Sequence, residues 1–189
     1  MIASGASVGQ HDCALLRSVM RSPVGDLALF SDGAALRAVV WPQDRAGRVF
    51  LSPWSDGHDH IIEQARHELG AYFEGSLRRF TIALNAQGTA FQHRVWRSLQ
   101  AIPFGSTRTY GEIGAALGMP GAARAVGAAN SRNPLSIIIP CHRLVGANGA
   151  LTGFAGGLSS KAWLLGHEQH VSAKDQDDVP PQDRCGGTG

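Results

Sequence analysis

The chain has 189 residues, of which 43% are hydrophobic and 17% are charged. This composition excludes collagen-like and fully disordered classes of protein, and the length suffices for one large domain or two small ones. No apolar stretch approaches the roughly 20 residues of a membrane span, and the polar start of the chain holds no secretory signal, so the sequence predicts no membrane contact.

Charge is distributed unevenly along the chain, although the formal net charge is only +2. Residues 1–87 carry eight arginines and nine acidic side chains, whereas residues 88–170 carry six arginines and Lys161 against only Glu112 and Glu168. A positive half beside a neutral half suggests an anionic partner for the second half. A generic basic surface is the alternative.

Three cysteines are present, and no pair of them has the spacing of metal ligands: Cys13, Cys141 and Cys185. Their odd number argues against a disulfide scaffold and favours a reducing compartment, which we expect to be the cytoplasm. Three of the histidines in the first half lie close together in the sequence without a suitable cysteine: His58, His60 and His67. We interpret these histidines as solvent-exposed, and we expect neither a metal site nor a cofactor.

The first elements of the chain read as strands. Residues 1–13 are predicted to form a disordered leader. Three strands follow, separated by a turn and by an Asp32-Gly33 hairpin signal: 15–20, 27–31 and 36–41. Pro42 ends the third strand, and residues 42–57 are predicted to form a long loop.

A helix is predicted from a cap at Asp59 to about Glu74, because apolar residues recur at one-face helical spacing: Ile61, Ile62, Ala65, Leu69, Tyr72 and Phe73. Alternation over 80–84 predicts a further short strand. The break at 85–88 sets a domain boundary, so residues 14–87 are expected to form an α/β domain with an antiparallel sheet and a helix. None of its residues indicates chemistry, and we interpret it as a support.

Residues 88–170 are predicted to form a mainly helical second domain. Thr89 can cap a helix that ends before Pro103. The stretch Thr109-Tyr110-Gly111-Glu112 leads into a short helix through Leu117, and a further short helix is expected over 122–130. Two short helices across a glycine-containing turn predict a helix-turn-helix, here of a winged-helix-like kind.

The helix predicted over 122–130 consists almost entirely of residues with small side chains, and Arg124 is its only long side chain. A helix that reads bases in the major groove needs several long polar side chains. Small residues instead permit close backbone approach to phosphates or to a narrow groove. Tight helix packing in a core explains the same residues equally well, so both interpretations stay open at this point.

A run of isoleucines leads into Pro140, Cys141 and His142. β-Branched residues prefer extended backbone, and proline restricts the residue before it, so the run predicts a rigid extended segment that ends in a thiol. A buried core cysteine is the alternative interpretation of this segment taken alone.

The end of the chain holds a glycine-rich loop over 152–158 and one more helix. Ser159 or Ser160 is expected to cap that helix, which is predicted to end near Glu168. Residues 171–189 are rich in Asp, Gln, Pro and Gly and are predicted to form a disordered tail.

These features together resemble the methylated-DNA–protein-cysteine methyltransferases (alkylguanine-DNA alkyltransferases) in their stand-alone bacterial form. The resemblance covers nearly all of residues 88–168 in order and at matching spacing, whereas the first domain matches only in outline. The matching stretches are Pro103-Phe104-Gly105, Tyr110-Gly111-Glu112-Ile113, Ala122-Ala123-Arg124-Ala125-Val126-Gly127, Asn133-Pro134, Pro140-Cys141-His142-Arg143, residues 151–158, Lys161, Trp163-Leu164-Leu165 and His167-Glu168.

The resemblance implies that Cys141 is both the nucleophile and the final acceptor of an alkyl group from O6 of guanine, and from O4 of thymine. It implies that His142 takes the thiol proton through a water molecule while Glu168 orients the histidine. Activation of the thiol then requires a lowered pKa. Tyr110 would donate to the departing guanine or support the DNA, and Asn133 would hydrogen-bond within the site. The thioether product has no leaving group, so each molecule should react once.

The resemblance also implies a partner, which is duplex DNA with an alkylated guanine, bound through the minor groove by a monomer without sequence preference. The damaged base must be flipped out of the duplex, and Arg124 would fill the space that it leaves. Small residues on the same helix would allow backbone contact with DNA: Ala122, Ala123 and Gly127. The pocket for the base would include three residues of the glycine-rich loop: Phe154, Ala155 and Gly156. Phe154 stands where the family often has tyrosine, so a phenol hydrogen bond is absent there.

Two other functions compete with this one. A lesion-binding module would flip the base without accepting the alkyl group, but relatives of that kind lack the acceptor cysteine that is present here as Cys141. A thiol hydrolase would need a distal base and an oxyanion hole, and it would leave the helix-turn-helix without a purpose.

Overall fold

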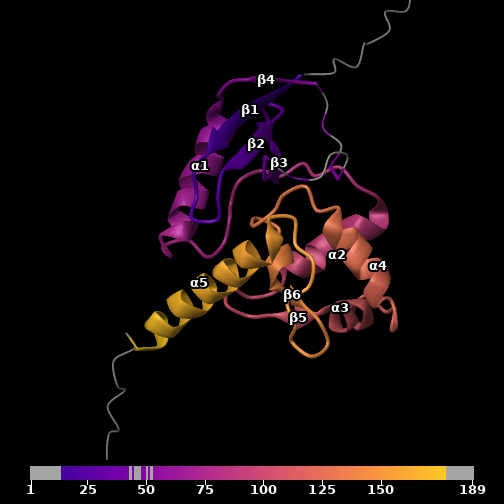
Figure 1. The fold of residues 1–189 in the computed structure, drawn as a ribbon. Helices are drawn as coiled ribbons and strands as arrows, with labels where there is room; N and C mark the ends of the chain where they lie inside the picture. Colours follow the sequence, from indigo (N-terminus) through magenta and orange to yellow (C-terminus); the bar gives the residue numbers. More distant parts are fainter. Residues whose placement is uncertain (1–13, 43, 45–47, 50, 52, 178–189) are drawn as a thin grey trace, which may run out of the picture.

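The computed structural model describes residues 14–177 apart from positions 43, 45–47, 50 and 52. Its first half is a four-stranded sheet in the order β3-β2-β1-β4, with one helix, α1, against one face (Figure 1). The predicted leader and most of the predicted tail lie outside the described residues. The α/β class with a helical second half is confirmed.

Three antiparallel strands form where the sequence predicts them: β1 (Leu15–Met20), β2 (Leu27–Ser31) and β3 (Leu36–Val40). The β2–β3 turn forms because the Asp32 carboxylate accepts the amides of Ala34 and Ala35 and Gly33 takes a φ of 85°. Alternate residues of β2 and β3 enter separate clusters on the two sheet faces.

Two expectations for the first half are wrong. The predicted loop 42–57 contains a strand, β4 (Trp54–Asp56), which pairs in parallel with β1, so the sheet is mixed and not purely antiparallel. All three β4 residues are exposed, so no alternation of apolar residues marks the strand. The strand predicted over 80–84 is reduced to a single bridge between Leu84 and Leu36.

Helix α1 (His60–Phe73) begins at the predicted cap, where the Asp59 carboxylate accepts the Ile62 amide at 2.7 Å. Its apolar residues enter the same core cluster as Leu29 of β2 and Val39 of β3. That cluster continues into the second half of the chain, so the two halves share one core.

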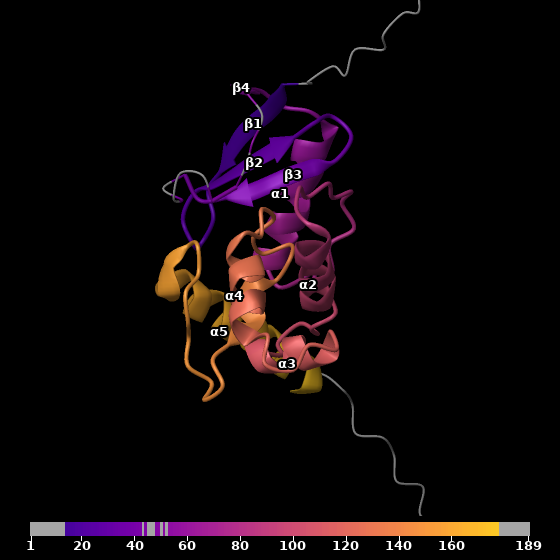
Figure 2. The same cartoon turned by 90° about the vertical axis from the view of Figure 1, so that its right-hand side faces the viewer.

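Three helices of the second half pack together, and α4 lies against both others (Figure 2). They are α2 (Ala90–Gln100), α3 (Tyr110–Ala116) and α4 (Ala123–Ser131). Thr89 and Thr109 begin α2 and α3 with reciprocal capping boxes to Gln92 and Glu112. The α3-turn-α4 pair is the predicted helix-turn-helix.

The isoleucine run is not the predicted extended segment. Ile137 takes a φ of 74°, which is an outlier for a β-branched residue, and the chain turns there. Cys141 opens a 3₁₀ turn (Cys141–Arg143), so Cys141 and His142 do not alternate across a strand. The turn leads into β6 (Leu144–Val145), which pairs in parallel with β5 (Arg108–Thr109). Neither short strand is predicted from the sequence.

Helix α5 (Gly157–Asp177) begins before the predicted serine caps and continues well past Glu168. Residues 171–177, which the sequence assigns to a disordered tail, are therefore helical. The added turns of α5 pack closely against two glycines. A Cβ on Gly75 would lie 2.7 Å from Val171, and a Cβ on Gly105 would lie 2.4 Å from Ser172, so only glycine fits at these two positions.

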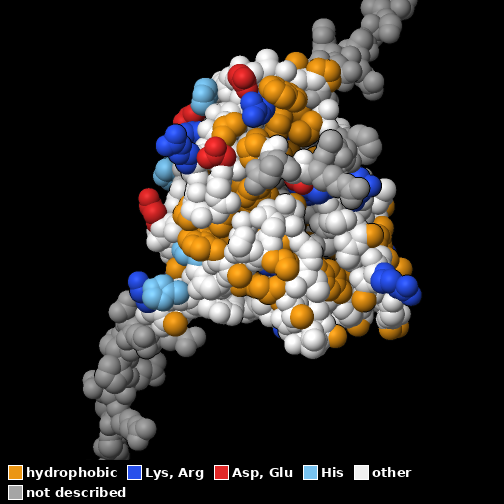
Figure 3. Space-filling view, in the orientation of Figure 1, with side chains coloured by type: hydrophobic (Ala, Val, Ile, Leu, Met, Phe, Trp, Pro, Cys, Tyr) orange, Lys and Arg blue, Asp and Glu red, His pale blue; other side chains and the backbone are white. Residues whose placement is uncertain are grey.

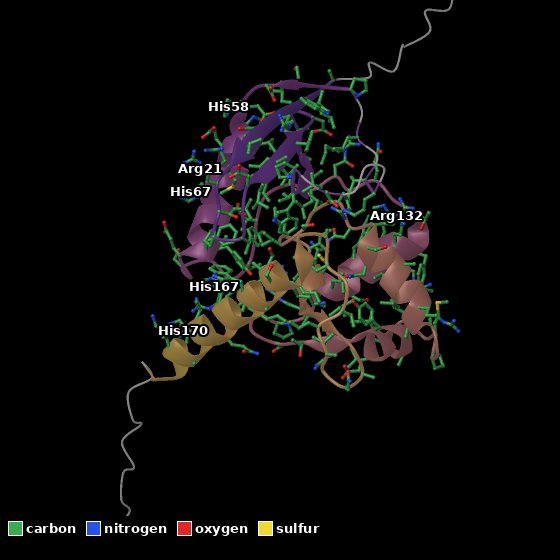
Figure 4. The ribbon with its side chains drawn as sticks, viewed as in Figure 1. Arg21, His58, His67, Arg132, His167 and His170 are labelled. Carbon is green, nitrogen blue, oxygen red and sulfur yellow. The ribbon has the colours of Figure 1, made fainter. Side chains whose placement is uncertain are left out.

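The described part of the chain has no helix that is long and apolar enough to cross a membrane. Within the same residues, no group of three or more His, Cys, Asp or Glu side chains has an arrangement that could hold a metal ion. Figure 4 shows His58 and His67 along the outer side of the first half, with His167 and His170 on α5.

Candidate active site

A pocket of 830 Å³ opens between α4, the glycine-rich loop and the loop that follows β3, and Cys141 is part of its lining. Only 4% of Cys141 is exposed. Six other predicted site residues also line the pocket: Tyr110, Ala123, Arg124, Gly127, Phe154 and Ala155. Ala122 and Gly156 do not line it, and three further predicted residues lie buried outside its lining: Asn133, His142 and Glu168.

Burial raises the pKa of the Cys141 thiol, although a hydrogen bond with Asn133 and the charges of Arg48 and Lys161 partly oppose this effect. The expected lowering of this pKa is therefore not found in the structure. The thiol is neutral at pH 7, and a thiolate requires a base that accepts its proton.

The fully buried Asn133 holds the chain that leads to the thiol. Its Nδ2 donates to the Ile139 carbonyl at 2.9 Å, and its Oδ1 accepts the Leu135 amide at 3.0 Å. The side chain thus bridges both ends of the turn that contains Ile137 and fixes where the backbone places Cys141.

His142 and Glu168 form a fully buried pair, with 2.8 Å between Nε2 and Oε1. Glu168 is ionised, because its pKa is about 2. A carboxylate accepts hydrogen bonds only, so Nε2 of the histidine carries the proton and Nδ1 presents a lone pair. This Nδ1 atom is buried and has no hydrogen-bond partner among the described residues. Burial also lowers the pKa of His142, so its ring is neutral and able to accept a proton.

Glu168 is the centre of a larger network than the sequence predicts. Arg143 donates from Nε to Oε2 and from Nη2 to Oε1, both at 2.9 Å. The Gly105 amide donates to Oε2 at 3.0 Å, and the Tyr72 hydroxyl donates to Oε1 at 2.8 Å. Hydrogen bonds from His142 and Arg143, together with the charge of the Arg143 guanidinium, hold the pKa of this carboxyl low against the opposing effect of burial.

Two residues of the first half, Tyr72 and Arg48, contact residues of the site. Neither contact is predicted from the sequence, which indicates only a supporting role for this half. Arg48 lines the pocket, and its Nη1 donates to the carbonyls of Asn133 at 2.7 Å and Ser131 at 3.3 Å. Asp44 holds the same guanidinium through an ion pair. Arg132, labelled at the end of α4 in Figure 4, donates to the Arg48 carbonyl at 3.3 Å. This arginine clamp therefore ties the loop after β3 to the chain that leads to Cys141.

Tyr110 stands at the side of the pocket with its ring against Gly127, where a Cβ would lie 3.8 Å away. Its hydroxyl oxygen accepts a hydrogen bond from Thr152 Oγ1 at 2.9 Å. The phenolic proton therefore remains for another acceptor.

The glycine-rich loop rests on Trp41 of the first half. The rings of Phe154 and Trp41 meet edge to face at 5.3 Å, and a Cβ on Gly156 would lie 2.5 Å from the same indole. Gly156 therefore serves packing and not the pocket surface. Behind the loop, the fully buried Lys161 donates from Nζ to the Thr152 carbonyl at 3.0 Å, and burial lowers its pKa.

Acidic side chains are unevenly distributed over the surface of the molecule. On the face in Figure 3, the acidic side chains lie in the upper half, over the sheet, α1 and the loop after β3. The sequence agrees, because residues 88–170 contain only Glu112 and Glu168 as acidic residues. Glu168 is buried, so its charge adds little to this surface.

Family models match both halves of the chain. The model described as 6-O-methylguanine DNA methyltransferase, ribonuclease-like domain, matches residues 15–86, and the DNA binding domain of the same description matches residues 90–170. A methylated-DNA–protein-cysteine methyltransferase of Mycolicibacterium paratuberculosis is 56% identical over 151 residues, which are 80% of this chain and 90% of that protein. One of Methanosarcina acetivorans is 45% identical over 78% of this chain and 94% of its own length.

A solved structure supports the same relation. The Mycobacterium tuberculosis protein OGT in complex with DNA is 42% identical to this chain and superposes with a TM-score of 0.73, covering 82% of this chain and 94% of that chain. The resemblance seen in the motifs is thereby confirmed over both halves. The chain belongs to the 6-O-methylguanine DNA methyltransferase family.

Proposed function

We propose that the protein repairs DNA by direct reversal, transferring a methyl or other alkyl group from O6 of guanine to the Sγ atom of its own Cys141. The observation that carries this proposal is the thiol in the pocket lining beside the buried His142–Glu168 pair. Family membership supports the same reaction.

The reaction needs a proton acceptor, because the resting thiol is neutral. In our proposal the proton passes through a water molecule to Nδ1 of His142, and Glu168 stabilises the imidazolium that forms. The thiolate then attacks the alkyl carbon, a C–S bond forms, and the bond from that carbon to O6 breaks. The Tyr110 hydroxyl donates a hydrogen bond to the departing guanine as negative charge develops on it.

The acceptor is consumed in the reaction. A thioether offers water no leaving group, so one molecule of protein removes one alkyl group and does not turn over. The reaction needs no cofactor. The lesion itself supplies the alkyl group, and the guanine leaves with the electron pair of the broken carbon–oxygen bond.

We further propose that α4 enters the minor groove as part of a monomer and contacts the backbone without sequence preference. Its exposed Arg124 at the mouth of the pocket would occupy the space left by the flipped base. The same pocket would accept O4-alkylthymine. A reduced thiol and access to DNA are both required, so we assign the protein to the cytoplasm.

The test is to mix the protein with duplex DNA that contains O6-methylguanine and to measure the intact mass. We expect one added methyl group per molecule, located on the Cys141 peptide, and none for Cys141→Ala. A Cys141→Ala variant that still binds the lesion would separate binding from transfer. Lesion binding by the wild type without any added mass would support a binding module instead, and turnover of an ester or amide would support a thiol hydrolase.

A further inference from the structure

The pocket face of α4 carries a series of residues spaced three apart. Arg124 is exposed, Gly127 is half-buried beside Tyr110, and Asn130 is only 6% exposed, yet all three line the pocket. Exposure therefore decreases along this face from Arg124 to Asn130, which is the most buried of the three. A base that entered the pocket would meet it.

Asn130 differs from the polar side chains beside it. Tyr110 and Thr152 bond to each other, Ser131 Oγ donates to the Ala128 carbonyl, and Asp44 pairs with Arg48. The Oδ1 atom of Asn130, in contrast, is buried without any hydrogen-bond partner in the part of the chain that the structure describes.

A buried carbonyl without a donor is destabilising, and a ligand that brings a donor regains that free energy on binding. The side-chain amide of asparagine rotates readily about χ2, so the oxygen can turn toward the pocket. The unpaired acceptor thus indicates the kind of group that the substrate should present, which is an N–H donor.

Alkylation at O6 removes the proton from N1 of guanine, so the base keeps a single donor group, the exocyclic amine at N2. Its ring nitrogens N1, N3 and N7 are acceptors. O4-alkylthymine has no N–H group left on its ring. One acceptor in the pocket can therefore distinguish the two alkylated bases.

We propose that Asn130 is a specificity-determining residue, whose Oδ1 accepts a hydrogen bond from the N2 amine of the flipped O6-alkylguanine. This inference rests on the proposed function and names the base that the pocket prefers. The amide holds the purine by its one donor group and disfavours alkylated bases that lack it.

The experiment compares O6-methylguanine with O6-methylhypoxanthine, which lacks only the N2 amine, in the same duplex. The readout is the single-turnover rate of methyl transfer to Cys141, followed by intact mass. Because the two leaving groups differ in reactivity, the decisive quantity is how the ratio of the two rates changes between wild type and Asn130→Leu. We expect the variant to lose about tenfold or more of the preference for guanine over hypoxanthine.

Asn130→Ala is the second variant, because it cannot overpack the pocket if leucine prevents folding. Asn85→Leu is the matched control, since it removes an exposed amide in the first half of the chain and should keep the wild-type ratio. A ratio that stays within twofold of wild type in the folded Asn130 variants, or equal losses with both substrates, would overturn the inference. Absence of methyl transfer from wild-type protein with either substrate would instead overturn the proposed function.

Discussion

Glu168 determines the protonation state of the residues around it. It is fully buried and accepts five hydrogen bonds, from Tyr72, Gly105, His142 and, twice, Arg143. Hydrogen bonds from His142 and Arg143 and the charge of the Arg143 guanidinium keep the carboxylate ionised, while burial keeps the His142 ring neutral. A buried charge pair of this kind keeps the imidazole in one tautomer, with Nδ1 free to accept a proton.

From these hydrogen bonds we predict that the free energy of unfolding decreases as the pH is lowered. The pKa of Glu168 is about 2 in the folded protein against an ordinary 4.5, so its contribution of about 3 kcal/mol is present above pH 4.5 and lost as the pH falls toward 2. The pKa of His142 is lowered from 6.5, so protonation of the unfolded chain also weakens folding below that pH. Both effects have the same sign.

Urea denaturation between pH 7 and pH 3 measures this dependence. Glu168→Gln should be less stable at pH 7, because Arg143 then lacks its buried partner, and its stability should vary less with pH than that of wild type. Parallel curves for the two proteins would contradict the assignment of the low pKa to Glu168.

At the scale of single residues, the sequence predicted the thiol, the histidine and the glutamate, because each stands within a specific motif. It gave no role to Asn130, although an asparagine on the one face of a small-residue helix was a usable signal. It also predicted a lowered pKa for Cys141, and that was wrong because burial, which no motif displays, has the largest effect on the thiol.

Among the elements, the glycine-rich loop depends on a contact that only glycine permits. The backbone of Gly156 approaches Trp41 so closely that a Cβ would lie 2.5 Å from the indole. Because Phe154 packs on the same indole, a displacement at Gly156 moves a side chain of the pocket lining.

Gly156→Ala should therefore destabilise the protein by about 1–3 kcal/mol and slow methyl transfer, because the loop must move away from Trp41. Thermal unfolding and single-turnover rates measure the two effects. Gly166→Ala is the matched control, since nothing lies near its Cβ position within α5, and it should be neutral or slightly stabilising. Equal behaviour of the two variants would refute the packing argument.

Elements with a strong local signal were predicted well, and elements fixed by distant contacts were not. The hairpin turn and the helix caps at Asp59 and Thr89 formed where expected. Strand β4 was missed because its residues are exposed and only pairing with β1 makes them a strand. The last turns of α5 were missed because a polar composition suggested disorder.

At the scale of the whole molecule, the first half is part of the site. Tyr72 on α1 donates to Glu168 across 96 residues of sequence, and Arg48 bonds to the chain that leads to Cys141. From the apolar spacing of α1, Tyr72 was predicted to be one of the buried positions of an amphipathic helix. That interpretation was correct for its ring, but it could not reveal the partner of its hydroxyl.

Tyr72→Phe tests this contribution, because it removes one hydrogen bond to a buried carboxylate and leaves the ring. We expect a loss of about 1–3 kcal/mol in stability, a fall of about tenfold in the rate of methyl transfer, and a shift of its pH profile. Thr81→Val is the matched control. It removes a hydroxyl that donates to the carboxylate of Glu68, outside the site, and should lower stability alone. If the transfer rate of Tyr72→Phe had the same pH profile as that of wild type, the tyrosine would contribute to stability and not to the reaction.

The convergence of separate segments on Glu168 has a consequence for amide hydrogen exchange. Gly105 lies in the connection after α2, yet its N–H is bonded to a carboxylate that α1, the 3₁₀ turn and α5 all hold. Local opening of that connection would break a bond inside this network, so the Gly105 amide should exchange with solvent only at the rate of global unfolding. The exchange of this one loop amide, followed by NMR, would then show whether the hydrogen bonds around Glu168 are formed.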